Sequence, residues 1–551
     1  MKRTFFFSLT LLVLFSSSGF AQVRALGSNV LRLGTGETTD NDDITLRKRY
    51  FEEIANARIF FENFSVGLRY EMSDPSEVGK NFQGIRRRWI EYRKDDLTLQ
   101  AGHTYMTVGR GLSVNMFESR PINYDSWIDG FSGSYEYSVA KDVIDIRPSL
   151  GVKAFAGNLD FVDIVDTKKP IQHIKSQGVS STIGLFNKKL NIGLGFVQAF
   201  TSVDEQGPGG IKTTLREVNQ PEISLSFITD NLEGYFGFTE MRSYLSQIFS
   251  KPASADQTGQ AMYGALSYSN EEFALTAEYK NYRYFLGPTG KPNENYFGKL
   301  PISNPPEVYK EFTYTTITRT THAVNFNDEL GFQVEANITA IPNFTITLNA
   351  AASSRHNGYT DVLDSSGLPT GKGAISVLPK LNDVAYYPFW EMFGEVEYEF
   401  GGLNYIKIFG HRRNNVIAYS GSKADEKRAT TFGAKLQYAT TKNQSLLAIL
   451  EVQDLYDSNR DTNEHKLSNL LFSAQYSFNP HITFGGIFDF STWYEVSRHI
   501  WPQAFVSFRI GSAHTVLASY GAERGGINCS GGVCRYVPAF KGFRFGLTSQ
   551  L

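Results

Sequence analysis

The sequence predicts an all-β protein, a single antiparallel up-and-down β-barrel of the kind that crosses bacterial outer membranes. Three observations predict it: apolar and polar residues alternate with period two, short and long connections take turns between these stretches, and the chain begins with an export signal. Alternation of this kind gives a strand one apolar face and one polar face. In a transmembrane barrel the apolar face meets lipid and the polar face lines the lumen.

The first 21 residues are predicted to be a secretory signal peptide. A basic start, Lys2-Arg3, precedes an apolar stretch from Phe5 to Phe15, and small residues end the segment at Ala21. We therefore expect cleavage after Ala21 and a single mature barrel domain over residues 22–551. Strand-like sequence begins almost directly afterwards, which argues against an energy-coupled receptor with a separate N-terminal plug domain.

Alternation is clearest in Phe64–Met72, where Phe, Val, Leu, Tyr and Met alternate with Ser, Gly, Arg and Glu. A soluble β-sandwich also alternates, so one strand does not separate the two architectures. The pattern recurs along the chain, in 190–196, 273–280, 344–349, 406–408 and 543–551. After the signal, no apolar run reaches the roughly 18 residues that a membrane helix needs. The repetition therefore favours a membrane barrel.

Eleven short connections alternate with longer polar segments. Turn-forming residues recur in them, and they lie at 62–63, 95–96, 140–143, 188–189, 230–231, 271–272, 340–343, 400–402, 439–442, 478–480 and 511–513. Short periplasmic turns and long extracellular loops are the pattern of outer-membrane barrels. Each turn joins two strands, and one strand is added at each end (27–33 and 537–551). The sequence therefore predicts about 24 strands, within a range of roughly 18 to 26.

Composition and closure agree with this architecture. Aromatic residues make up 14% of the chain, which suits two interfacial girdles. The sheet must close because unpaired backbone groups in hydrocarbon cost several kcal/mol each. Apolar residues two apart lead to Leu551, so we expect the barrel-assembly machinery as a partner during biogenesis and outer-membrane lipid afterwards. The formal net charge of -2 gives no reason to expect a nucleic-acid partner.

A basic cluster is the first candidate pore-lining group. One predicted strand carries Arg86, Arg87, Arg88 and Arg93, and the following loop carries Arg110, Glu118 and Arg120. Alternation puts Arg86 and Arg88 on one face and the other two arginines on the opposite face. We therefore expect the strand to project beyond the bilayer or to bend at Gly84. The cluster is interpreted either as a basic strip in a pore constriction or as a salt-bridged lumen wall that stiffens the barrel.

An acidic row is the second candidate group. Glu395, Glu397 and Glu399 share one face of one predicted strand. Such a row on a lumen wall would favour cations or hydroxyl-rich solutes. The alternative is ordinary lumen polarity, with the row paired to Lys407 on the next strand or to Arg413.

The two cysteines, Cys529 and Cys534, are predicted to form a disulfide in the last outward loop. Two thiols alone make an incomplete metal site, so no metal or cofactor is expected. The nine histidines are scattered and form no H-E-x-x-H motif. We therefore expect no enzymatic activity. A set of loop aromatics is interpreted as stacking on sugars or as packing the loops together: Tyr282, Tyr284, Phe285, Tyr309 and Tyr314.

Two regions resemble a known family. The first contains RRWIEY (87–92), LTLQAGH (97–103) and VGRGL (108–112), and the second is the ending from Tyr520 to Cys534. They resemble a family of uncharacterised, porin-like outer-membrane proteins of gliding and gut Gram-negative bacteria. The resemblance covers the mature chain and implies a barrel in the cell outer membrane, with no established substrate or catalytic residue. The first hairpins are also similar, more faintly, to barrels that export or tether acidic polysaccharide.

Two functions follow as hypotheses. The first is a porin-like channel for small solutes or saccharides, narrowed by inward folding of the loops 285–329 and 356–388. Charged lumen residues would then set its selectivity. The alternative is a plugged structural or binding barrel that holds surface polysaccharide or a partner of a secretion or uptake complex.

Overall fold

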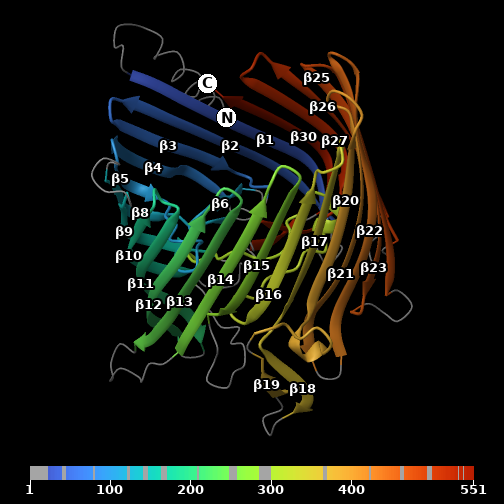
Figure 1. Cartoon of the computed structure of the whole chain (residues 1–551). Coiled ribbons are helices and arrows are strands. Elements are labelled where there is room, and N and C mark those ends of the chain that lie inside the picture. Colours follow the sequence, from blue (N-terminus) through green and yellow to red (C-terminus); the bar gives the residue numbers. More distant parts are fainter. Residues whose placement is uncertain are drawn as a thin grey trace.

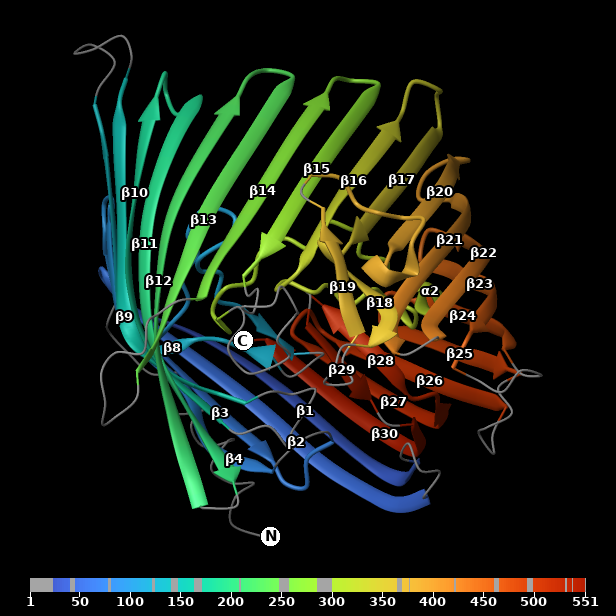
Figure 2. The same cartoon turned by 90° about the horizontal axis from the view of Figure 1, so that it is seen from below.

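The structure is a computed structural model that describes residues 23–39, 45–77, 81–120, 124–139, 147–162, 171–207, 210–246, 257–284, 300–363, 369–375, 377–420, 423–459, 465–492, 499–530, 533–537 and 539–550. The predicted signal peptide and the predicted turn at 140–143 lie outside these residues. The described chain forms one closed antiparallel sheet of 24 strands, as the sequence predicted. The last strand pairs with the first and completes the ring, so the N- and C-terminal strands lie side by side (Figures 1 and 2).

The strands of the barrel are β1 (Val23–Thr39), β2 (Thr45–Phe61), β3 (Phe64–Ser73), β4 (Phe82–Lys94), β5 (Leu97–Thr104), β8 (Ile128–Ser138), β9 (Ser149–Phe161), β10 (Gln172–Leu185), β11 (Leu190–Gly207), β12 (Gly210–Ile228), β13 (Leu232–Ser246), β14 (Gln257–Ser269), β15 (Phe273–Arg283), β16 (Glu329–Ile338), β17 (Phe344–Ser354), β20 (Phe389–Glu399), β21 (Tyr405–Ser420), β22 (Lys423–Thr441), β23 (Gln444–Asp457), β24 (Lys466–Asn479), β25 (Ile482–Ser491), β26 (Ile500–Ile510), β27 (His514–Glu523) and β30 (Ala539–Gln550). The loops between them carry β6 (Glu118–Ser119), β7 (Tyr124–Asp125), α2 (Thr315–Thr318), β18 (Asn357–Leu363), β19 (Pro369–Ala374), η2 (Val384–Tyr386), β28 (Gly526–Ser530) and β29 (Val533–Val537). Of the eleven predicted short turns, the ten within the described residues all fall at or next to a connection between neighbouring strands.

The two faces of the sheet differ in the way that the alternation predicts. On β3, Phe64, Val66 and Leu68 are exposed on the outer face, whereas Ser65 and Glu71 are buried on the inner face. Exposed Phe, Leu, Ile and Val side chains continue around the ring, so the outer wall is apolar. None of the described helices is long and apolar enough to span a membrane. A closed sheet with an apolar exterior and a polar interior makes this protein an outer-membrane β-barrel.

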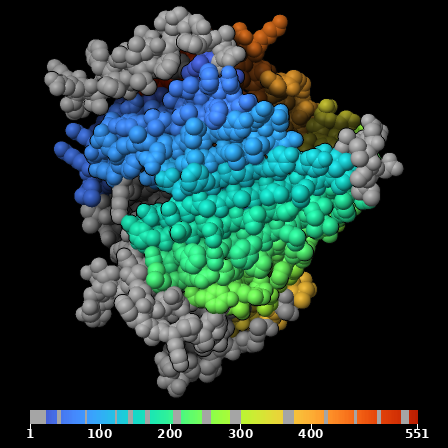
Figure 3. Space-filling model, turned by 90° about the vertical axis from the view of Figure 1, so that its left-hand side faces the viewer, coloured from blue at the N-terminus to red at the C-terminus, as the bar shows by residue number. Residues whose placement is uncertain are grey.

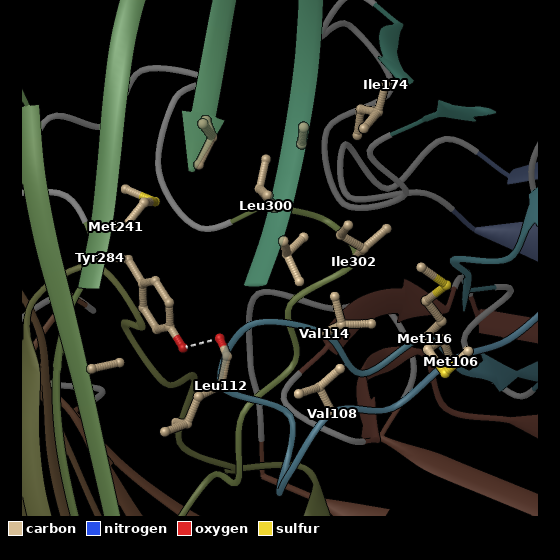
Figure 4. Close-up of a cluster of buried hydrophobic side chains, with 14 of the residues drawn as sticks. Met106, Val108, Leu112, Val114, Met116, Ile174, Met241, Tyr284, Leu300 and Ile302 are labelled. Carbon is tan, nitrogen blue, oxygen red and sulfur yellow. Dashed lines mark hydrogen bonds between the residues drawn. The ribbon is translucent and has the colours of Figure 1, made fainter. Parts of the chain in front are cut away.

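Two loop segments fold into the lumen. The first inner segment comprises residues 105–120 and 124–127, between β5 and β8, and the second comprises residues 300–328, between β15 and β16. They meet the inner wall in one apolar cluster, where Val108, Leu112 and Val114 lie close to Leu300 and Ile302 (Figure 4). Inward folding of the loop 285–329 is therefore confirmed for its described part.

The other long loop, 356–388, does not fold inward as we expected. It contacts β15 through Tyr279, Asn281 and Arg283, which alternate with the lumen-facing Lys280 and Tyr282. Asn281 is hydrogen-bonded to His356 at 3.0 Å, Tyr279 donates to the carbonyl of Val377 at 2.7 Å, and Arg283 donates to the carbonyl of Ile375 at 3.3 Å. The loop thus lies against the outer face of β15, and its hairpin β18–β19 projects beyond the rim (Figure 1).

Candidate functional site

The tip of the second inner segment is fastened to the wall by a buried arginine. Arg413 on β21 pairs with Glu391 on β20 at 2.6 Å, and both side chains are about 1% exposed or less. The same guanidinium donates hydrogen bonds to the carbonyl oxygens of Ile317 and Thr320, at 3.2 and 2.7 Å. Arg413 therefore neutralises a buried carboxylate and holds the segment at the same time.

Two more acids hold the segment from strands further along the ring, β23 and β25. Glu451 on β23 accepts hydrogen bonds from the backbone N–H groups of Thr315 and Thr316, at 3.0 and 2.7 Å. Asp489 on β25 pairs with Arg319 at 2.6 Å. Hydrogen bonds to charged groups contribute roughly 1.5–3 kcal/mol each, so these contacts form a strong attachment.

At its base, the segment is attached to β15 and β16. Lys280, which is fully buried, pairs with Glu329 at 2.6 Å and also donates to the carbonyl oxygen of Glu307. His322 contacts the same carboxylate at 3.2 Å and stacks on Phe389, with ring centroids 4.0 Å apart. The second inner segment is thus attached to β15 and β16 as well as to β20–β25.

The first inner segment crosses to the opposite part of the wall. Ser113 donates to Glu222 on β12 through both its N–H, at 3.0 Å, and its hydroxyl. Gly109 has a φ of 53°, and a Cβ at this position would overlap the Glu222 carboxylate and the Tyr235 hydroxyl. The next residue, Arg110, pairs with Glu233 on β13 at 3.1 Å. Since Glu233 follows a periplasmic turn directly, the tip of this segment reaches the periplasmic end of the lumen.

The two inner segments also bind each other. Asn115 donates to the carbonyl oxygen of Asn304 at 2.9 Å, and Asn304 donates to the carbonyl oxygen of Asn115 at 2.7 Å. Ser303 donates to the carbonyl oxygen of Ser113 at 2.6 Å, and Tyr124 donates to that of Pro301 at 2.8 Å. Residues 300–304 are therefore part of the same packed unit as the first inner segment.

The structure brings part of the predicted basic cluster together. Two acidic side chains lie within ion-pair distance of its arginines. Glu118 on β6 pairs with Arg120, with Arg69 at 2.6 Å and with Arg87 at 3.4 Å. Glu71 on β3 pairs with Arg120 and, at 3.9 Å, with Arg86. Each acid thus shares several guanidinium groups, an arrangement that matches the salt-bridged lumen wall.

A β-bulge corrects our assignment of faces on β4. Arg69 pairs with Arg87 and Tyr70 with Ile85, so Arg86 is an extra residue without a partner on β3. The bulge lies at Arg86 rather than at Gly84, and it lets Arg86 and Arg87 reach the same acids. Bulges have this effect because one inserted residue shifts the alternation.

Arg88 does not line the lumen, in contrast to our prediction. It pairs in register with Leu68, which is exposed on the outer face, and its own side chain is 67% exposed. Its guanidinium lies 3.3 Å from the carboxylate of Asp129 on β8. The ion pair of Arg88 and Asp129 is therefore part of the outer wall.

The acidic row lies on the opposite wall from the basic cluster. Lys407 pairs with Glu395 at 3.2 Å and with Glu397 at 2.5 Å, as the lumen-polarity alternative proposed, and Tyr314 of the second inner segment also donates to Glu395. Glu399 ends β20 near the periplasmic turn. Counting along the ring, β4 is the fourth strand and β20 the sixteenth of 24. The two groups therefore face each other across a lumen that the inner segments occupy.

A protein-family model matches residues 37–551, which is most of the chain. It describes a family of unknown function, DUF6029. The chain belongs to DUF6029. No curated protein matches the sequence significantly.

Several solved outer-membrane proteins are similar in fold to this DUF6029 barrel. The siderophore receptor PirA from Pseudomonas aeruginosa has a TM-score of 0.43 and 9% identity, over 96% of this chain and 80% of that one. The copper transporter OprC has a TM-score of 0.43 and 10% identity, over 97% and 82%. The alcaligin receptor FauA from Bordetella pertussis has a TM-score of 0.37 and 10% identity, over 96% and 76%. Likeness at this level says nothing about a ligand.

The loop aromatics pack the inner segments of the DUF6029 barrel. Tyr282, Tyr284, Tyr309 and Tyr314 are all buried, and Tyr284 donates to the carbonyl oxygen of Leu112 at 2.5 Å (Figure 4). Because these four side chains are buried, they fit the interpretation that the aromatic residues pack the loops together, and not the interpretation that they stack on sugars. Phe285 lies outside the described residues. Among the described residues, no group of three or more His, Cys, Asp or Glu side chains could hold a metal ion.

The functional residues that sequence reasoning missed are the buried wall acids Glu222, Glu391 and Glu451. In the sequence they resemble any polar residue of an alternating strand. A signal was nevertheless present in the loops of this DUF6029 chain, because 300–328 and 105–120 contain more apolar and aromatic residues than a solvated loop needs. Those residues are the ones that the structure buries: Met106, Val108, Leu112, Val114, Met116, Leu300, Ile302, Val308, Tyr309, Tyr314 and Ile317.

The cysteines of this DUF6029 chain are predicted to be oxidised. Cys529 and Cys534 are register partners across the hairpin β28–β29. Directly opposed residues of antiparallel strands have Cα atoms about 4.5–5.5 Å apart, which suits a disulfide. We expect the native protein to resist iodoacetamide and to gain two adducts by mass spectrometry after reduction. Labelling without a reductant would show free thiols and contradict this.

Docking of the inner segments is expected to be stronger at pH 5 than at pH 8. Burial raises the pKa of Glu307 to about 7 and the pKa of Asp125 to about 6. A carboxyl group whose pKa rises on folding stabilises the folded state when it is protonated, and this contribution is lost as pH rises through the raised pKa. Burial also acts to raise the pKa of Glu118, but guanidinium groups hold it below its usual value, so Glu118 stays ionised over this range.

Hydrogen exchange measured at both pH values, corrected for intrinsic rates, checks this expectation in the DUF6029 barrel. Protection of 300–328 should fall from pH 5 to pH 8 in the native protein. Glu307→Gln, which imitates the protonated carboxyl, should make that fall smaller. Equal or greater protection at pH 8 would count against the expectation.

Proposed function

We propose that this barrel is a gated outer-membrane channel for small polar solutes, closed at rest by its two inner segments. One observation carries the proposal: three charged side chains of the wall hold the tip of the second inner segment, beside a small apolar cluster of Tyr314, Ile317, Phe393 and Phe409. Arg413, Glu451 and Asp489 each contact this tip. A lumen of 24 strands is wide enough for an aqueous path once its filling moves, because barrels of 16–18 strands already enclose one.

The second inner segment has two parts that support a gate. Leu300, Ile302 and Val308 belong to the apolar cluster around the first inner segment. Residues 309–322, here called the gate segment, contact β16, β17 and β20–β25 instead. Val308, the last residue of the first part, has a φ of 57°, a strained conformation for a β-branched residue. Strain of this kind persists only where surrounding contacts impose it, and it is frequent at switch regions. Release of the gate segment would let Val308 relax.

The charged residues that the sequence analysis identified as pore-lining candidates would act on the solute path in this proposal. With the gate segment displaced, solutes would pass between the basic cluster (Arg86, Arg120 and Glu118) and the acidic row (Glu395, Glu397 and Glu399). Arg110 would lie at the periplasmic end of the path. Opposed charges of this kind set ion preference in pores.

The second candidate function is a plugged binding barrel that never opens. It is favoured by the fully buried pair of Arg413 and Glu391, because breaking such a pair is costly. In that case the loops, among them the hairpin β18–β19, would hold a surface polysaccharide or a partner of a secretion or uptake complex.

Single-channel recording in planar bilayers separates the two functions. We expect rare, brief openings for the native protein and steady ohmic steps after the gate segment is replaced by a Gly-Ser linker of equal length. A shift of reversal potential on Glu395→Gln in the opened variant would then assign that residue to selectivity. Silence of the linker variant, with the barrel folded as judged by its heat-modifiable mobility in gels, would reject the channel and favour the plugged barrel.

A further inference from the structure

The outer wall between β3 and β9 carries an apolar groove at membrane depth. Figure 3 looks onto this side of the molecule, where the N-terminal strands are blue and the following ones cyan and green. The groove has a volume of about 540 Å³. Its floor consists of small outward residues on three adjacent strands, Ala101, Gly133, Ala154 and Ala156, and larger side chains, Ile90, Tyr92, Leu99 and Phe131, rise beside it.

A second, polar groove continues the first toward the extracellular side. It has a volume of about 280 Å³ and shares Phe131 and Ala156 with the apolar groove. Its other lining residues include Asn158, Gln177 and Lys175. The ring of Phe131 is 71% exposed and stands at the border of the two grooves.

The depth of the two grooves matches the two parts of a lipid. Lys175 lies ten positions from Leu185, the periplasmic end of β10. At roughly 3.3 Å per residue and a strand tilt of roughly 40°, that is a height of about 25 Å, the height of the apolar band of such barrels. The ammonium group of Lys175 therefore lies at headgroup level. Ala154, five positions above the periplasmic end of β9, lies in the hydrocarbon region.

The charge of the polar groove favours an anion. Lys175 is exposed and makes no ion pair within the described part of the chain. The one acid that lines the groove, Asp129, is already paired with Arg88 at 3.3 Å. A cation without a carboxylate partner, above an apolar groove, is complementary to a phosphate carried on an acyl chain.

We propose that these grooves bind one phosphate-bearing lipid of the outer leaflet. An acyl chain lies on the floor of Ala101, Gly133, Ala154 and Ala156, and Lys175 contacts the phosphate. This site is independent of the proposed gating, because the five residues assigned to lipid contact all face outward, away from the inner segments. The bound lipid would anchor β5 and β8, the two strands that the first inner segment connects.

Native mass spectrometry of the detergent-solubilised full-length protein tests the proposal. The probes are lipid A, lipid A without its phosphates, and inorganic phosphate. We expect the native protein to bind one molecule of lipid A. Lys175→Glu should weaken this binding at least about fivefold and leave dephosphorylated lipid A unaffected, since a basic residue near anionic headgroups contributes about 1 kcal/mol. Ala156→Trp, which fills the floor, should abolish binding of both lipids.

Matched controls lie on outward positions outside these grooves. Lys541→Glu changes a lysine on β30, and Ala448→Trp changes an alanine on β23; both should bind lipid A as the native protein does. The proposal is overturned if both groove variants retain native binding, if the controls lose binding equally, or if inorganic phosphate displaces the lipid. The two groove variants act on different parts of the ligand, so either one is a sufficient test if the other fails to fold.

Discussion

Replacing Arg413 by leucine is expected to release the gate segment from the wall and to open the barrel. The substitution leaves the carboxylate of Glu391 buried without its partner and removes the hydrogen bonds to Ile317 and Thr320. Breaking a buried ion pair by removing one partner costs roughly 3–5 kcal/mol. That is a change of roughly two to three and a half orders of magnitude in the fraction of undocked segment, since 1.4 kcal/mol is tenfold.

Two measurements check this effect. Single-channel recording should show a much higher open probability for Arg413→Leu than for the native protein. Hydrogen exchange should show lost protection in residues 309–322 while the barrel strands keep theirs. An Arg413→Leu protein with native conductance and native protection would remove Arg413 from the attachment.

A second variant separates the buried charge from the lost contacts. In Arg413→Leu/Glu391→Leu no carboxylate remains uncompensated, and a buried ion pair replaced by apolar residues is often neutral for stability. We therefore expect the double variant to open less than the single one. Arg428→Leu is the matched control, because Arg428 pairs with Glu426 at 2.7 Å but is 59% exposed. Exposed pairs contribute at most about 1 kcal/mol, so this variant should stay closed.

The barrel was predictable from the sequence because its signals are local. Period-two alternation, as in Phe64–Met72, assigns each strand its lumen face without reference to any other strand. Turn residues such as those at 62–63 and 95–96 mark where the chain reverses. Closure then follows from the cost of unpaired backbone groups in lipid, and the strand count of 24 follows from the turns.

The lumen was only partly predictable because its contacts join distant residues. Ser113 and Glu222, or Thr316 and Glu451, are more than a hundred residues apart, and no local pattern relates them. The faces of β4 were wrongly assigned for a different reason. One extra residue at Arg86 shifts the alternation, and a bulge leaves no mark in the residue types themselves.

The loop 356–388 shows the same limit. Its length and polarity fitted inward folding as well as outward folding. The direction is fixed by Asn281 and Tyr279, which present polar groups on the outer face of β15 and bind His356 and the carbonyl of Val377. From the sequence alone, polar outward-facing residues near the extracellular end of a strand are interpreted as the place where the strand leaves the membrane. Only the structure reveals that a loop covers them.

Leu112→Ala is expected to weaken the first inner segment strongly without opening the channel. Leu112 is fully buried in the apolar cluster, so the substitution leaves a cavity and costs roughly 2–5 kcal/mol. The gate segment keeps its charged contacts with β20–β25, which do not involve this cluster. Hydrogen exchange should therefore show lost protection in residues 105–120, whereas single-channel recording should show native closure. Leu403→Ala, at a periplasmic turn where Leu403 is 77% exposed, should change neither quantity. If Leu112→Ala opened the barrel as Arg413→Leu does, the two inner segments would act as one gate, and the division of the second inner segment at Val308 would be wrong.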